Sequence, residues 1–179
     1  MAFYLDAQRS TSADAIANFK LYQEYLTAHR ARFPERAYEL ATSAWYYDFS
    51  DHRCPHDGWL ESMVIGEMAT GERHESRKLQ LRIRLLGAYQ NGHMEFFYPG
   101  VIRYQLIGAD VLRGHGDWRY DEFRLSNDGH LLHEIEWSGL TGTARWVIES
   151  VDVYFTWLPS AEQPPNKAHE AVEHPGRAE

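Results

Sequence analysis

Apolar and polar positions alternate most regularly between residues 78 and 98, and the alternation predicts a β-hairpin. A two-residue period is typical of a strand with one buried face. Asn91-Gly92 is a preferred sequence for a type I′ turn, so we expect a two-residue loop there. This loop would place Leu85 opposite Tyr98 and Gly87 opposite Phe96. The apolar members of the first strand are Leu79, Leu81, Ile83 and Leu85.

A second hairpin is predicted from residues 120–126 and 130–137. We favour a three-residue loop in which Gly129 adopts the left-handed conformation. This register sets Phe123 opposite His133, whereas a two-residue loop would mix apolar and charged residues on one face.

The next strand continues the same sheet and predicts a β-bulge. Pairing Trp137 with Ala144 sets Ile135 against Trp146. Further along, the apolar positions change from even to odd numbers, which indicates a bulge near Glu149-Ser150.

Two helices are predicted before the strands, over residues 13–30 and 34–43, and the first six residues suggest an edge strand or a docked arm. In the first helix, Ile16, Phe19 and Leu26 recur at helical spacing. The expected fold is α+β, with two N-terminal helices and about seven mostly antiparallel strands in a curved or split sheet. Residues 1–158 would form one domain, and the polar, proline-bearing residues 159–179 a flexible tail.

Net charge and residue composition restrict which partners the protein could bind and where in the cell it would be found. The 179 residues carry a net charge of −8, which disfavours nucleic-acid binding and favours a basic protein partner. With its single cysteine the chain forms no internal disulfide, and no apolar run is long enough to span a membrane. The first ten residues lack the pattern of a signal peptide, so we expect a cytoplasmic protein.

Three residues in the stretch DHRCPHD are a possible metal site. His52, Cys54 and His56 are all zinc-ligand types, but their spacing lacks the two separated ligand pairs of structural zinc sites. We therefore favour a polar loop with a half-buried thiol, and expect no cofactor.

The glycine-rich loop RGHGDW suggests a possible acid–base site. His115 and Asp117 could pair, with His133 nearby on the second hairpin. No nucleophile motif accompanies them, and glycines with an Asp also suit an ordinary turn. The turn, and a non-catalytic function, are the favoured interpretations.

The charged face of the second hairpin is the main candidate binding surface. The register above places Glu122 directly opposite Glu134, with Glu136 further along the same face. Like charges opposite one another destabilise a sheet, so an acidic face retained at this cost would suit a cationic partner. An ordinary solvated face, with arginines offsetting the repulsion, is the alternative. The loop 45–59 adds aromatic candidates for binding, namely Trp45, Tyr47 and Trp59.

The segments HDGWLESM, RLLGAYQNGHMEFFYPGV, GDWRYDEFRLSNDGHLLHEIEW and ARWVIESVDVYFTW resemble those of small, uncharacterised, β-rich bacterial proteins. In style they are similar to the immunity proteins of polymorphic toxin systems. This resemblance implies a compact, acidic, non-catalytic domain that blocks a toxin. The predicted function is therefore protein binding, and the alternative is a small-molecule-binding domain or hydrolase-like enzyme in an aromatic-lined cavity.

Overall fold

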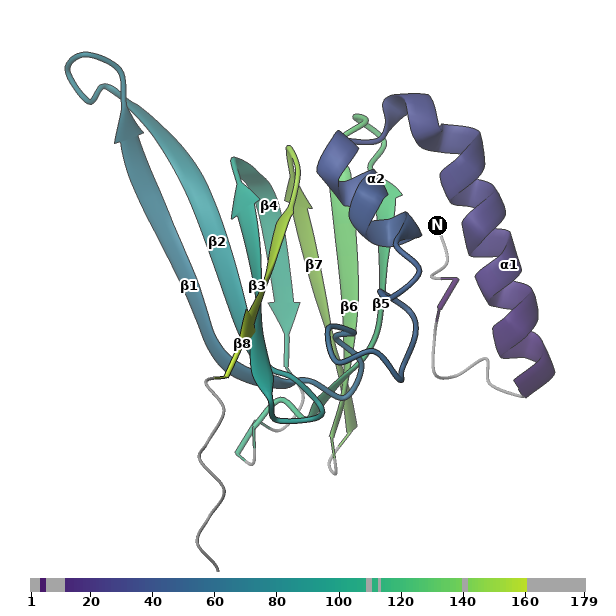
Figure 1. Cartoon of the computed structure of the whole chain (residues 1–179). Helices are drawn as coiled ribbons and strands as arrows, with labels where there is room; N and C mark the ends of the chain where they lie inside the picture. Colours follow the sequence, from purple (N-terminus) through teal and green to yellow (C-terminus); the bar gives the residue numbers. More distant parts are fainter. Residues whose placement is uncertain (1–3, 6–11, 109–110, 113, 140–141, 161–179) are drawn as a thin grey trace, which may run out of the picture.

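The structure is a computed structural model that describes residues 4–5, 12–108, 111–112, 114–139 and 142–160. Within these ranges, helices lie beside an eight-stranded antiparallel sheet that does not close (Figure 1). The helical elements are α1 (Ser12–His29), the 3-10 turn η2 (Arg30–Arg32) and α2 (Glu35–Thr42). The strands are β1 (Trp59–Thr70), β2 (Ser76–Leu86), β3 (Gly92–Pro99), β4 (Val101–Ile107), β5 (Asp117–Leu125), β6 (Leu131–Gly139), β7 (Gly142–Ser150) and β8 (Tyr154–Pro159). The predicted α+β class is confirmed, with eight strands in place of about seven.

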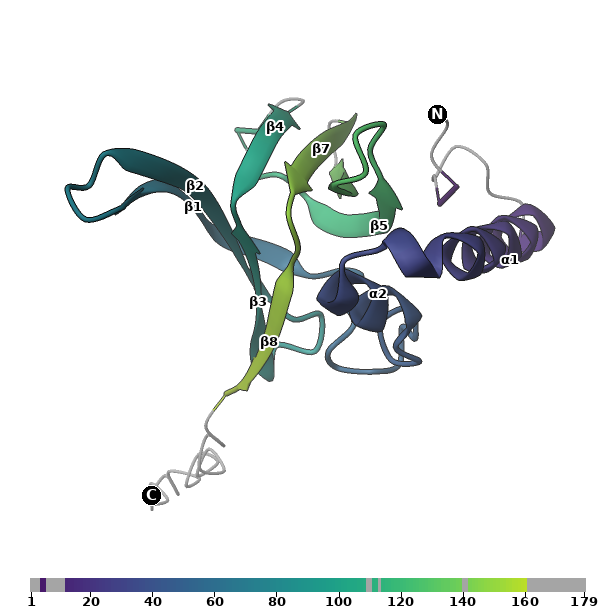
Figure 2. The same cartoon turned by 90° about the horizontal axis from the view of Figure 1, so that it is seen from above.

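The sheet bends sharply between β5 and β1. Its strand order is β4-β7-β6-β5-β1-β2-β3-β8, and β5 pairs with β1 only through Trp59 and Asp117. This single pair divides the sheet into two arms of four strands, which curve around a common interior (Figure 2).

Aromatic side chains fill the interior between the two arms. Phe96 of β3 stacks on Trp118 of β5, with 5.1 Å between the ring centroids. The hydroxyl oxygen of Tyr98 on β3 lies 2.7 Å from Nδ1 of His133 on β6. This buried hydrogen bond joins the two arms directly. The core therefore depends on contacts between strands that are not neighbours in the sheet.

Helix α1 covers the edge of β5 that β1 leaves unpaired. The Tyr22 hydroxyl accepts a hydrogen bond from the Phe123 N–H (2.8 Å) and donates one to the Phe123 carbonyl (3.1 Å). The Tyr25 hydroxyl accepts from the Leu125 N–H at 2.8 Å. Buried backbone groups need partners, and here tyrosines supply what a neighbouring strand would otherwise supply.

The register of the second hairpin is confirmed. Phe123 lies opposite His133, and Gly129 has φ +83° in the connecting turn. On the next strand, Trp137 pairs with Ala144 and Ile135 with Trp146, again as predicted.

The first hairpin forms, but its predicted register is wrong. Leu85 pairs with Met94 rather than Tyr98, and the loop covers residues 87–91 instead of two residues. The cause is a distant side chain, Trp157 of β8, whose ring packs on Gly87 and Gly92. A Cβ atom at Gly92 would lie 2.3 Å from this ring. The glycines thus make room for tryptophan rather than for a tight turn.

The predicted last strand is two strands. β7 ends at Ser150, and β8 begins at Tyr154 on the opposite arm, where it pairs with β3. The apolar positions change phase because the chain leaves one arm for the other. The pairing of β7 with β4 is irregular at Glu149 and Ser150, the predicted place, but the extra residue lies on β4 between Val101 and Arg103 rather than on β7.

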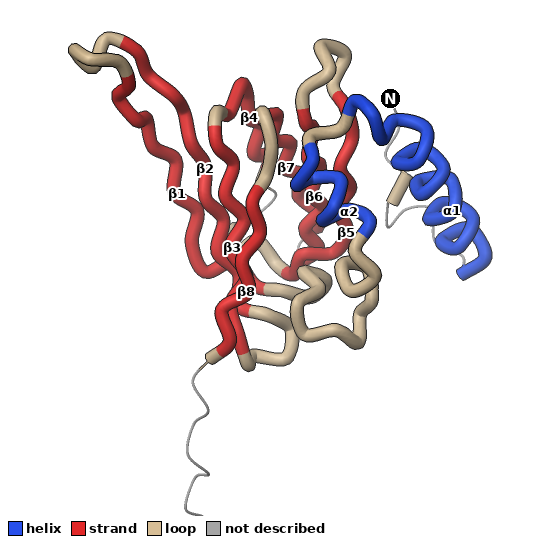
Figure 3. Tube along the Cα trace, turned by 45° about the horizontal axis from the view of Figure 1, so that its top comes forward, coloured by secondary structure: helices blue, strands red, loops and turns tan. Residues whose placement is uncertain are grey.

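The remaining predictions concern the helices, one loop and the tail. Both helices begin and end within two residues of the predicted bounds. Residues 43–58 form turns with no strand, and Trp59, the last residue of the predicted loop 45–59, begins β1 (Figure 3). Neither helix in the described ranges has the length and apolar content needed to cross a bilayer. Beyond Ser160, the predicted tail lies outside the described residues.

Replacing Tyr22 by Phe should lower the free energy of unfolding by about 1–3 kcal/mol, because it leaves the buried Phe123 N–H without its partner. Urea unfolding monitored by tryptophan fluorescence would measure the change. Tyr104→Phe, at an exposed tyrosine of edge strand β4, is the matched control. Equal stabilities of the two variants would contradict this role of Tyr22.

Candidate functional site

The predicted acidic face exists, but it is buried. Glu122 is 0% exposed, and Glu134 and Glu136 are nearly as inaccessible. The carboxylates do lie on the face of the sheet opposite the tryptophan core, as the alternation predicted. The expectation that this face meets solvent is wrong, so these three residues do not form an accessible docking surface.

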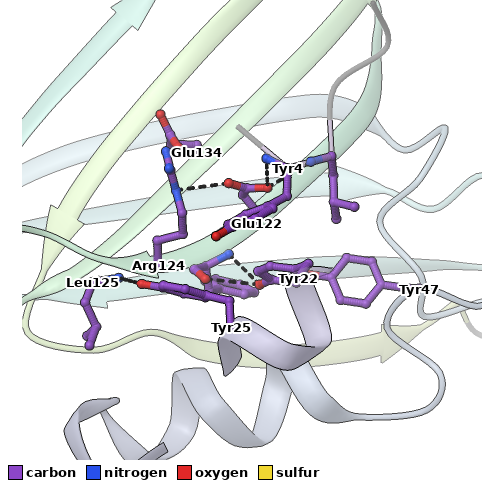
Figure 4. A network of polar contacts seen from close by, with 10 residues as sticks. Tyr4, Tyr22, Tyr25, Tyr47, Glu122, Arg124, Leu125 and Glu134 are labelled. Atoms are coloured by element: carbon purple, nitrogen blue, oxygen red, sulfur yellow. Dashed lines mark hydrogen bonds and ion pairs between the residues drawn. The ribbon is translucent and has the colours of Figure 1, made fainter. Parts of the chain in front are cut away.

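Residues 4 and 5 and Arg124 contact two of these carboxylates, Glu122 and Glu134. Glu122 Oε2 accepts hydrogen bonds from the backbone N–H groups of Tyr4 (2.7 Å) and Leu5 (2.9 Å), which matches the predicted docked arm. Arg124 forms ion pairs with Glu122 (3.0 Å between Nε and Oε1) and with Glu134 (Figure 4). The two glutamates face each other as predicted, and Arg124 offsets their repulsion.

Burial raises the pKa of the Glu122 carboxyl to about 7, while the N–H groups of Leu5 and Tyr4 and the charge of Arg124 act in the opposite direction. A carboxyl with this pKa changes its protonation state near neutral pH.

The alternative catalytic set of His115, Asp117 and His133 is not assembled. His115 packs against the rings of Trp137 and Trp146, at 5.9 and 5.1 Å between centroids. His133 is fully buried and pairs instead with Asp121, with 2.9 Å between Nε2 and Oδ2. The structure thus replaces the predicted partners of His133 with one that the sequence analysis did not single out.

Asp121 is the centre of a buried polar cluster. Its Oδ1 accepts from Trp118 Nε1 (2.9 Å), and its Oδ2 accepts from the Tyr46 hydroxyl (2.7 Å) as well as from His133. Burial lowers the pKa of His133, which favours the neutral ring with its proton on Nε2 and leaves Nδ1 to accept from Tyr98. Every side-chain nitrogen and oxygen of this His–Asp pair has a hydrogen-bond partner within the protein, so we assign the cluster a structural role.

A sequence signal for Asp121 was present. Asp121 shares odd numbering with Phe123 and Leu125, the residues predicted to face inward on this strand. A carboxylate at an inward position requires donors around it, since burying an unpaired charge is costly.

The possible metal ligands do not converge. His52 stacks on Tyr89, with 4.1 Å between ring centroids, whereas His56 stacks on Phe49 at 3.8 Å. Cys54 is buried, and burial raises the pKa of its thiol to about 12. No group of three metal-ligating side chains occurs among the residues described, and a thiol with this pKa is a poor nucleophile.

The aromatic loop contributes to a cavity rather than to a flat surface. Tyr47 lines the cavity and bonds to the Tyr22 hydroxyl at 3.3 Å. Trp45 packs elsewhere, against Phe155, and Trp59 is 53% exposed at the start of β1. Of the three aromatic candidates, only Tyr47 belongs to the cavity wall.

The cavity has a volume of about 320 Å³ and lies between the first half of α1, the loop that follows α2, and the beginning of β5. This volume falls within the range of about 300–1,000 Å³ that is usual for small-molecule sites. Its wall is predominantly aromatic and apolar. The lining residues are Tyr4, Leu5, Ala15, Ile16, Asn18, Phe19, Tyr46, Tyr47, Phe49, Cys54, Pro55, His56, Trp118, Arg119, Tyr120 and Asp121.

Comparison with known proteins adds no assignment, because no protein-family model, curated protein or solved structure matches this chain. The cavity and its lining residues therefore carry the functional argument.

Replacing Glu122 by Gln should change how stability depends on pH. The Glu122 carboxyl has a pKa of about 7 in the folded protein and its ordinary value of 4.5 in the unfolded chain. Between pH 4.5 and 7 the folded state therefore binds the proton more tightly than the unfolded state does. The stability of the wild type relative to the variant should therefore be greatest below pH 4.5. It should fall by about 3 kcal/mol as the pH rises past 7.

Urea unfolding of both proteins from pH 4.5 to 8 would measure this difference. Since all other titrating groups are shared, the difference isolates Glu122. A constant stability difference across this range would show that the Glu122 pKa is not raised.

Proposed function

We propose that the protein binds a small, largely apolar molecule in the aromatic cavity. The observation that carries this proposal is the combination of volume, aromatic lining and an apolar rim. Ile16, which is 75% exposed, and Phe49 both line the cavity and are exposed to solvent. Exposed apolar residues beside a concave site are a common feature of ligand entry points.

Binding without catalysis fits the cavity chemistry better than hydrolysis does. The thiol of Cys54 is held protonated by burial, and Asp121 is fully engaged by its three donors. A hydrolytic site needs an activated nucleophile beside a free base. The groups lining this cavity supply shape and apolar surface instead.

Filling the cavity should abolish binding. In an Ala15→Trp variant the indole would occupy space between α1 and the loop wall, and affinity for naphthalene should fall at least tenfold. Naphthalene binding is measured from the NMR chemical shift of the indole N–H of Trp118, a residue that lines the cavity.

Ala17→Trp is the control, because Ala17 is an exposed residue of the same helix that does not line the cavity. It should bind naphthalene as the wild type does. Unchanged binding by Ala15→Trp, or shifts confined to residues outside the cavity, would refute the proposal.

Protein binding in the cytoplasm, as the immunity-like resemblance implies, is a second candidate that we propose for a different surface. The β1–β2 hairpin extends away from the rest of the molecule (Figure 1), and Val64, Ile65 and Met68 are exposed on it. Successive side chains of a strand point to opposite faces, so Ile65 lies on one face of the hairpin and Val64 and Met68 lie on the other. Apolar side chains are therefore exposed on both faces. The net charge of −8 of the whole chain favours a basic partner, whereas residues 59–86 hold five Arg and Lys against four Glu, so this hairpin would contact a partner through its apolar side chains.

Affinity capture with the wild type and with a Val64→Glu, Met68→Glu double variant tests this second candidate. A genuine partner should be recovered by the wild type, lost with the variant, and recovered again with Ala15→Trp. A partner captured equally by all three proteins would place the interface elsewhere.

A further inference from the structure

Arg119 lies at a bulge in β5, beside the cavity. Trp118 and Tyr120 pair with two adjacent residues of β6, which leaves Arg119 without a partner on that strand. A bulge of this kind bends the strand and turns its side chains away from the regular alternation. Residues 118–121 all line the cavity, whereas a regular strand presents only alternate residues to one side. The bulge thereby lets consecutive side chains, Arg119 among them, contribute to one wall.

Arg119 carries the only accessible charge among the described residues that line the cavity. Asp121 also lines it, but this residue is 4% exposed and its carboxylate accepts hydrogen bonds from three buried donors. Burial lowers the pKa of His56, which favours its neutral form at pH 7. The side chain of Arg119, by contrast, is 41% exposed. Arg119 is therefore the charged residue of the wall that a ligand can contact.

The guanidinium of Arg119 keeps donors free for a ligand. Its Nη1 lies 3.5 Å from Oδ1 of Asp57, at the long limit of a hydrogen bond, and its Cζ lies 5.5 Å from the ring centroid of Tyr120. This side chain has no other polar contact within the described part of the chain. Both members of the ion pair are exposed, and such pairs contribute little to stability. With five N–H donors, Arg119 can retain Asp57 and still bind a second carboxylate.

We propose that the cavity binds an aromatic carboxylate, with the ring against the aromatic wall and the carboxylate on the guanidinium of Arg119. This inference rests on the proposed small-molecule function and adds the chemical class. The planar guanidinium donates two parallel hydrogen bonds to a carboxylate, and flat rings pack on aromatic side chains. A cationic ligand would meet no accessible carboxylate among the described lining residues, since Asp57 does not line the cavity and Asp121 is buried. A single guanidinium also suits one negative charge better than the greater charge of a phosphate monoester.

Three naphthalene derivatives of similar shape test the proposal on the wild-type protein. At pH 7, 2-naphthoate is an anion, 2-naphthamide is its neutral analogue, and 2-naphthylmethylamine is a cation. We expect 2-naphthoate to bind at least about tenfold more tightly than the other two, because a charge-assisted pair replaces a neutral or a repulsive contact. NMR titration that follows the indole N–H of Trp118, a residue of the cavity wall, measures the three affinities.

Two variants locate the preference on the chain. Arg119→Gln should lose it and bind 2-naphthoate and 2-naphthamide about equally, because the glutamine offers no charge to the carboxylate. Arg77→Gln is the control, because Arg77 on β2 also forms an exposed ion pair, with Glu67, and does not line the cavity. This variant loses the same charge and should keep the preference for 2-naphthoate.

The outcomes separate this proposal from the function on which it rests. If the wild type binds 2-naphthoate no more tightly than 2-naphthamide, or prefers the amine, the carboxylate class is overturned, while the small-molecule function stands if Ala15→Trp still blocks naphthalene. A preference for 2-naphthoate that survives in Arg119→Gln overturns the role of Arg119. If no probe binds the wild type, naphthalene included, both proposals fail. Because the probe comparison uses the wild type, it does not depend on the folding of any variant.

Discussion

One buried carboxylate, Asp121, joins the parts of this molecule that the sheet alone leaves apart. It receives hydrogen bonds from Trp118 on its own strand, from His133 on β6, and from Tyr46 in the loop after α2. Through His133 the connection continues to Tyr98 on the other arm of the sheet. Because β5 and β1 share a single residue pair, backbone pairing does little to fix the angle between the arms. A carboxylate removed from water must keep its donors, so this cluster tolerates only a narrow range of arrangements.

The same cluster explains why the cavity is apolar despite the polar residues around it. Asp121 and Tyr46 line the cavity, but their oxygens are engaged in the cluster, and the Tyr22 hydroxyl is committed to the backbone of β5. The wall that remains is predominantly aromatic and apolar. The fold thereby uses its polar atoms to connect elements and leaves an aromatic wall.

The alternation of residues predicted the second hairpin to the residue, because Gly129 and the need to keep glutamates off the core left one acceptable register. The predictions that were wrong depended on contacts from far along the chain. Trp157 occupies the space beside Gly87 and Gly92, so the expected Asn91-Gly92 turn does not form. A two-residue period separates two faces of a sheet but does not say which face meets solvent, and the N-terminal segment covers Glu122. An aromatic-lined cavity was among the alternatives, but its place in the fold could not be predicted, since its walls come from four separate segments.

Strand β5 links the central cluster to the loop that forms one wall of the cavity. The Asp57 N–H donates to the Trp118 carbonyl, and the Trp118 N–H donates to the Gly58 carbonyl, at 2.8 and 2.9 Å. The loop that carries His56 is thus fastened at the residue whose side chain donates to Asp121. Any change that shifts Asp121 should therefore also shift the wall facing a ligand.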